Sequence, residues 1–218
     1  MSVENLKEEV CNAIESMKDR LLAVSRTIHA NPELALKETK AAALLTAEIE
    51  SAGLPVERGV CGLDTAFISD FGSQNGPCVA ILAEYDALPE IGHACGHNLI
   101  ATAALGAALS LAKLGDRLPG RVKLMGTPGE EGAGGKILMD LKGAFNKVDA
   151  AMMIHPGSVN LTAMPTLAST SVKIIYHGRP AHASASPEKG INALDAIVTA
   201  YQAIAQLRQH IQNTERIH

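Results

Sequence analysis

The sequence predicts an α/β fold in which helices cover a partly parallel β-sheet. Short apolar runs with the period of a strand alternate along the chain with segments whose apolar residues recur every three or four positions. Such alternation is typical of a sheet with parallel strands. The composition agrees, because 47% of the 218 residues are hydrophobic and 19% are charged, as in an ordinary core-forming chain.

The first part of the chain is predicted to be helical. Apolar residues recur at steps of three and four from Leu6 to Ile28, which indicates one long amphipathic helix that ends before Pro32. A second helix is predicted from Lys37 to Ser51, and Gly53 is suited to end it.

Strands and helices alternate in the middle of the chain. The turn-rich segment 72–77 predicts a hairpin connection between the first two of these strands. The predicted elements are strands at Thr65–Ser69, Cys78–Ala83, Val122–Gly126 and Ala150–Ile154, and helices at His97–Leu114 and Gly134–Leu141.

The pattern lapses between Pro156 and Pro165. A new strand is then predicted at Thr170–His177, followed by a helix at Ile191–Ile211. We therefore expect a domain boundary near residue 166, with residues 1–166 in one domain and residues 167–218 forming part of a second.

Charge and composition exclude several classes of function. The net charge is −4, there is no basic block, and aromatic residues make up only 3% of the chain, so nucleic-acid binding is not expected. The longest mainly apolar run, Leu99–Ala112, falls short of the roughly 20 residues of a membrane span. The N-terminus lacks the apolar core of a secretory signal, and the four cysteines show no disulfide framework. These features predict a cytoplasmic protein.

Side chains of metal-ligand type follow three of the predicted strands, where functional groups of open α/β sheets gather. Glu84 and Asp86 follow the first of these strands, and a loop then brings Cys95 and His97 to the start of a helix; the other two strands lead into Glu130-Glu131 and His155. Each group taken alone has a structural reading, such as solvated carboxylates or a hydrogen-bonded histidine. Because all three strand ends lie at one edge of the sheet, together they predict a metal site.

The adjacent pair Glu130 and Glu131 suggests two roles. Neighbouring residues in extended backbone point to opposite sides, so one carboxylate can bind metal while the other faces a water molecule as general base. This arrangement indicates metal-assisted hydrolysis of an amide or ester. An alternative, with Cys95 as nucleophile and His97 as base, leaves Glu130, Glu131 and His155 without a role.

Six motifs make the chain resemble the aminoacylase and glutamate-carboxypeptidase superfamily of dinuclear metallopeptidases, in particular its amidohydrolase branch. The resemblance implies a zinc-exopeptidase-like three-layer α/β fold, followed by the start of an α+β lid domain that mediates dimerisation. The motifs are Ser25–Glu33, Tyr85–Pro89, Gly92–His97, Gly129–Gly135, His155–Pro156 and Gly178–Ser184.

The resemblance also implies roles for individual residues. Glu130 matches the general base. The matching metal ligands are Cys95, His97, Glu131 and His155, which would hold two divalent ions, zinc or manganese, with cobalt as a possible substitute in vitro.

Two further residues match positions around the metal site. Asp86 matches a residue that orients a metal ligand, and its alternative reading is an exposed turn residue. His182 matches a lid histidine that in dimeric relatives reaches the neighbouring subunit's site to bind the substrate or its developing oxyanion. Its alternative reading is a turn histidine without a chemical role. The resemblance therefore also implies a homodimer formed through the lid domain.

Two departures from the family pattern refine these expectations. His97 is followed by Asn98, as in the p-aminobenzoyl-glutamate hydrolase and β-alanyl-dipeptide hydrolase members, which favours an N-acyl amino acid or unusual dipeptide as substrate. Family members are about twice as long, so we expect a C-terminally truncated chain without the last metal-ligand histidine. A noncatalytic chain that binds metal or associates with a longer partner is the alternative function.

Overall fold

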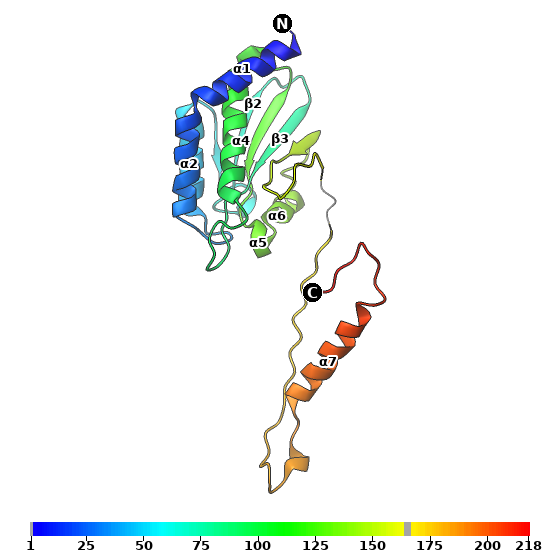
Figure 1. The fold of residues 1–218 in the computed structure, drawn as a ribbon. Helices are drawn as coiled ribbons and strands as arrows, with labels where there is room; N and C mark the ends of the chain where they lie inside the picture. Colours follow the sequence, from blue (N-terminus) through cyan, green and yellow to red (C-terminus); the bar gives the residue numbers. More distant parts are fainter. Residues whose placement is uncertain (1, 164–166) are drawn as a thin grey trace. The chain divides into compact units, whose positions relative to one another are not determined.

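The computed structural model describes residues 2–163 and 167–218 (Figure 1). Contacts within the chain divide it into two compact units, Met1–Ser158 and Val159–His218. The boundary predicted near residue 166 lies outside the described residues.

The first unit begins with two helices, α1 (Val3–Ser16) and α2 (Lys18–Ala30), which meet at an angle (Figure 1). The single helix predicted from Leu6 to Ile28 is therefore wrong. Met17 has non-helical backbone angles and ends α1, yet its side chain is buried like those of Leu21 and Val24 in α2. The apolar spacing continues through the kink because both helices turn the same stripe toward the core, so periodicity alone does not show the break.

Within the described residues, five strands form one mixed sheet in the order β1-β2-β4-β3-β5. β4 runs antiparallel to β2 and parallel to β3, and β3 also runs parallel to β5. The strands are β1 (Glu57–Arg58), β2 (Phe67–Gly72), β3 (Cys78–Ala83), β4 (Arg121–Gly126) and β5 (Ala150–Met152).

The hairpin predicted at residues 72–77, which connect β2 and β3, is wrong, because β4 lies between these two strands. The connecting segment instead forms hydrogen bonds with the first residue of β4 and with the residue before it. Ser73 N–H donates to the Gly120 carbonyl at 2.9 Å, and Arg121 N–H donates to the Pro77 carbonyl at 2.9 Å. Turn residues mark the change of direction but do not determine which strand pairs with which.

Helices cover both faces of the sheet, which confirms the predicted α/β class. On one face, α4 packs against β3 and β4, with α1 and α2 packed over it, while α3 contacts α4 and β2. On the other face Met139 of α6 packs with Ala80 and Met125 of the sheet. The remaining helices of this unit are α3 (Thr39–Ser51), the 3-10 helices η1 (Val60–Gly62) and η2 (Gly115–Arg117), α4 (His97–Ala112), α5 (Glu130–Ala133) and α6 (Gly135–Leu141).

The second unit contains the 3-10 helix η3 (Pro187–Lys189) and the helix α7 (Ala193–Leu207). The Asn192 side chain caps α7 by accepting a hydrogen bond from Leu194 N–H at 3.1 Å. The strand predicted at Thr170–His177 is absent from this described segment, and an isolated bridge joins Arg179 to Ile191 instead. A strand requires a hydrogen-bonded neighbour, and none of the described residues of this unit pairs with residues 170–177.

None of the helices in residues 2–163 and 167–218 has the length and hydropathy needed to cross a membrane.

Candidate metal centre

The candidate site lies at the carboxyl ends of three parallel strands. β3 and β4 are in register from their first residues to their last, so Ala83 and Gly126 lie side by side. Glu84 follows β3 directly, and Thr127 continues β4 by donating its N–H to the Ala83 carbonyl at 2.8 Å. The sheet thereby brings together the loop after β3 and the loop after β4, which are more than 40 residues apart in sequence.

His97, the first residue of α4, is the most central side chain of the site and is 1% exposed. Its Nδ1 contacts the Asp86 main-chain carbonyl at 2.9 Å and the Asp86 Oδ1 atom at 3.0 Å. With the proton on Nδ1, the Nε2 lone pair is available to a metal ion. Nε2 faces Glu84 Oε2 at 3.4 Å, and Glu130 Oε2 and Glu131 Oε1 at 3.9 Å each.

Asp86 connects His97 to the loop after β4. Its Oδ2 accepts a hydrogen bond from Glu131 N–H at 2.9 Å, while Oδ1 faces the His97 ring. Burial alone would raise the pKa of Asp86, but the His97 and Glu131 hydrogen bonds outweigh it and hold the pKa below its ordinary value. Burial alone would lower the pKa of His97, and the hydrogen bond with Asp86 and the charge of Glu84 raise it above the ordinary value.

The loop that carries Glu130 and Glu131 depends on glycine. Gly129 and Gly132 have positive φ angles of 66° and 87°, and a Cβ atom on Gly135 would lie 1.6 Å from the Pro128 carbonyl oxygen. The tight turn brings both carboxylates within 3.9 Å of His97 Nε2, so the expectation that they point to opposite sides is wrong. The reason is that Glu130 lies in a distorted helical turn, not in extended backbone.

Burial and the nearby charge of Glu84 raise the pKa of Glu130, whose side chain is 40% exposed. A carboxylate with a raised pKa holds a proton more readily, as a general base must.

Cys95 contacts the same loop. Its hydrogen bond to the Glu131 carboxylate, together with burial and the charges of Glu131 and Glu130, raises the pKa of the thiol to about 11. A thiol with such a pKa is protonated near neutral pH and is a weak nucleophile in the absence of metal. The alternative in which Cys95 attacks the substrate is therefore disfavoured.

Two sets of three ligand-type side chains converge within the described part of the chain. In each set the ligand atoms lie within 4.8 Å of one another: Glu84, His97 and His155 form the first, and His97, Glu130 and Glu131 the second. His155 is exposed, with its ring centroid 6.1 Å from that of His97. Cys95 is in neither set and reaches the site through Glu131.

His182 lies in the second unit, and its Nδ1 accepts hydrogen bonds from Ser184 N–H at 3.3 Å and Ala185 N–H at 3.2 Å. Its role in substrate binding stays a prediction, as do the individual roles of the other site residues.

Sequence reasoning assigned no role to Glu84, although it directly follows a buried strand. Its side chain is 2% exposed and forms an ion pair with Lys136 of α6. A charged residue that directly follows an apolar strand is a signal of a buried functional carboxylate, because a buried carboxylate needs a partner of opposite charge.

Sequence reasoning also missed Glu38, which is fully buried. Its carboxylate accepts hydrogen bonds from Leu36 N–H and Gly129 N–H at 2.8 Å each, and from the Thr65 hydroxyl at 2.9 Å. Glu38 thus ties the segment before α3 to the residue that precedes Glu130. Its neighbours Lys37 and Thr39 are polar, so nothing in the sequence marks it as buried.

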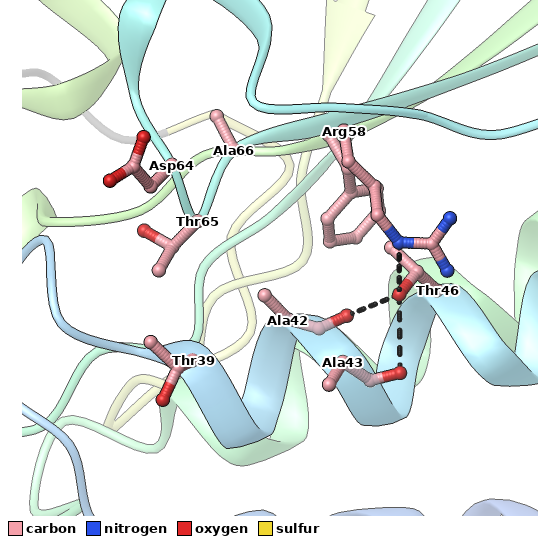
Figure 2. A pocket seen from close by; sticks show the side chains of 9 residues that line it. Thr39, Ala42, Ala43, Thr46, Arg58, Asp64, Thr65 and Ala66 are labelled. Atoms are coloured by element: carbon pink, nitrogen blue, oxygen red, sulfur yellow. Dashed lines mark hydrogen bonds between the residues drawn. The ribbon is translucent and has the colours of Figure 1, made fainter.

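A separate cavity of about 170 Å³ lies beside α3 (Figure 2). Its lining includes none of the candidate site residues. Arg58, the cation at its wall, donates from Nε to the Thr46 hydroxyl at 3.2 Å, as Figure 2 shows, and pairs with Glu50.

Fold and site together define an α/β domain that gathers metal-ligand side chains at one edge of its sheet. The chain belongs to peptidase family M20/M25/M40, whose family model matches residues 80–215. This membership confirms the resemblance to the dinuclear metallopeptidases.

Among curated proteins, the chain is similar to the Xaa-Arg dipeptidase of Mus musculus, with 42% identity over 99% of this chain and 53% of the mouse protein. It is also similar to one of the subunits of p-aminobenzoyl-glutamate hydrolase from Escherichia coli (strain K12), with 37% identity over 95% of this chain and 47% of that protein. The chain thus spans about half the length of the curated relatives it matches.

Among solved structures, a dinuclear metal-binding peptidase of family M20 from Bacillus subtilis is 27% identical. It aligns with a TM-score of 0.58 and covers 63% of this chain and 42% of its own.

Proposed function

We propose that this chain forms the metal-binding part of a metal-dependent amidohydrolase that cleaves the amide bond of an N-acyl amino acid or an unusual dipeptide. The observation that carries the proposal is the convergence of three carboxylates within 3.9 Å of His97 Nε2. Carboxylates collected around one buried imidazole repel one another unless a cation lies between them.

The donor set fits two divalent ions. We assign Cys95, His97, Glu131 and His155 as ligands, a mixture of sulfur, nitrogen and oxygen that suits zinc and also admits manganese or cobalt. The unpartnered Nε2 atom of the buried His97 supports this assignment. Asp86, which bonds the other ring nitrogen, orients His97.

A bound divalent ion supplies Lewis acidity, which polarises the scissile carbonyl and makes water more acidic. In our proposal Glu130 takes the proton from the attacking water and delivers it to the leaving amine. Its exposure of 40% leaves the carboxylate open to water, as this role requires.

The substrate class rests on the relatives. The names of the mouse and Escherichia coli proteins specify a dipeptide and an aminobenzoyl-glutamate, both cleaved at an amide bond next to an amino acid. A small acyl amino acid or dipeptide is thus the substrate that we propose.

We further propose a homodimer formed through the second unit, with His182 binding substrate. An exposed apolar face of α7 supports a subunit contact, because Leu194, Ile197 and Tyr201 are 63%, 48% and 65% exposed. A cytoplasmic location is proposed from the free thiols of all four cysteines.

The test is hydrolysis by the purified chain supplied with zinc, manganese or cobalt. The substrates are dipeptides ending in arginine, lysine or ornithine, p-aminobenzoyl-glutamate and N-acyl amino acids. We expect release of a free amino acid from at least one of them, loss of the activity with a chelator, and its recovery on adding metal. A folded, metal-loaded chain that hydrolyses none of them contradicts catalysis by this chain and favours the noncatalytic alternative.

A further inference from the structure

We propose that Glu84 is an additional metal ligand, which shares one ion with His97 and His155, and that Lys136 holds its carboxylate in the orientation required. This inference rests on the proposed function, because it concerns the same metal centre.

The first observation is a pair of buried polar atoms without partners. Within the described residues, Glu84 Oε2 and His97 Nε2 are both buried and neither has a hydrogen-bond partner. The two side chains are 2% and 1% exposed. Buried polar atoms are nearly always paired, so two orphaned atoms that face each other indicate a missing shared partner.

The second observation is the distance between these atoms. An oxygen and a nitrogen that bind one tetrahedral zinc ion, each about 2.1 Å from the metal, lie about 3.4 Å apart. Glu84 Oε2 and His97 Nε2 are 3.4 Å apart and do not form a hydrogen bond. The third member of this set, His155, places a ring nitrogen within 4.8 Å of a ligand atom of Glu84 and of a ring nitrogen of His97.

The chemistry of His97 then divides the donors between two ions. Nδ1 is bonded to Asp86, so only Nε2 can bind metal, and one lone pair serves one ion. Glu84 is closer to Nε2 than Glu131, at 3.4 Å against 3.9 Å. We therefore group Glu84 with His97 and His155. Glu131 and its hydrogen-bonded neighbour Cys95 belong to the second ion.

Lys136 explains why one oxygen of Glu84 remains free. Its ammonium group pairs with Glu84 Oε1 and leaves Oε2 directed at His97. Lys136 also compensates part of the charge of a carboxylate that is out of contact with water. The competing explanation is a metal-free ion pair, in which Glu84 only balances a protonated His97.

The experiment measures the zinc affinity of residues 1–218 by competition with a chromophoric chelator, for wild type and Glu84→Gln. Glutamine keeps the shape of the side chain but replaces the anionic oxygen with a weak ligand. We expect Glu84→Gln to weaken one zinc site by at least about tenfold. With cobalt, the absorption band of the Cys95 thiolate should remain, because Cys95 binds the other ion.

The matched control is Asp70→Asn. Asp70 also pairs with a basic side chain, that of Arg121, but it lies within β2. This variant loses an ion pair without touching the site, and its zinc affinity should stay within about twofold of the wild-type value.

Zinc affinity in Glu84→Gln equal to that of wild type overturns the proposal while the proposed function stands. A wild-type chain that binds neither zinc nor manganese nor cobalt overturns both. If Glu84→Gln does not fold, Glu84→Asp replaces it. The shorter carboxylate should weaken the same zinc site and spare the cobalt band of Cys95, and unchanged zinc affinity there contradicts the proposal equally.

Discussion

Glu130→Gln is expected to lower the turnover rate by about 10³-fold while the metal content of the protein stays at the wild-type level. Glutamine keeps the size of the side chain but cannot take a proton from water. We assign Glu130 no part in holding the metal, so its replacement should spare binding. Turnover is measured as amino acid released under saturating substrate, and bound metal by elemental analysis of the same sample.

The adjacent Glu131 provides the matched control. Both carboxylates lie 3.9 Å from His97 Nε2, so distance alone does not distinguish them. Glu131→Gln should lose metal and turnover together, because Glu131 is assigned as a ligand. If Glu130→Gln loses metal and Glu131→Gln retains it, the two roles are exchanged and the assignment is wrong.

Glu38→Ala is expected to lower the free energy of unfolding by about 3 kcal/mol and to reduce turnover as well. The substitution leaves three donors without their acceptor, the N–H groups of Leu36 and Gly129 and the Thr65 hydroxyl. The N–H of Gly129 then no longer fixes the loop that presents Glu130. Urea denaturation measures the stability, and the turnover assay measures whether Glu130 still acts at its full rate.

Two variants serve as controls for Glu38→Ala. Glu38→Gln keeps an oxygen for the two main-chain donors and should cost about 1 kcal/mol. Glu57→Ala removes an exposed carboxylate from β1 and should change stability by less than about 0.5 kcal/mol. Equal stability in all three variants would show that the carboxylate of Glu38 does not hold the loop.

The pH dependence of the free energy of unfolding provides a second test of the role of Glu38. Burial outweighs the hydrogen bonds and raises the pKa of Glu38 above 4.5. A carboxyl group whose pKa is higher in the folded state binds its proton more tightly there, so its contribution to stability falls as pH rises from about 4.5 to the raised pKa. The stability of wild type relative to Glu38→Gln should therefore fall as the pH rises across this range, and the difference should be constant above it.

The sequence predicted the succession of helices and strands in the first unit well, because each element has a hydrophobic period of its own. It failed where structure depends on partners distant in sequence. β4 inserts between β2 and β3, which the turn at 72–77 does not reveal. Residues 170–177 have strand-like composition, but no strand of the described residues lies beside them.

In the candidate site, too, the sequence predicted local features but missed those that depend on residues distant in sequence. Strand ends identified the residues that gather, since register places Ala83 beside Gly126. Orientation was not predictable: the glycine-dependent turn directs Glu130 and Glu131 to the same side. Glu38 was missed because one of its hydrogen-bond partners, the N–H of Gly129, lies 91 positions away in the sequence.

The central claim is that this chain holds divalent metal at the carboxyl ends of β3 and β4, and metal content tests it most directly. The purified wild-type chain, loaded with zinc and freed of unbound ions, is compared with Cys95→Ser and Glu131→Ala by elemental analysis. We predict stoichiometric zinc in the folded wild type and a clear loss in both variants. A folded wild-type chain that retains neither zinc nor, in parallel loadings, manganese or cobalt would contradict the claim, as would variants that retain as much zinc as wild type.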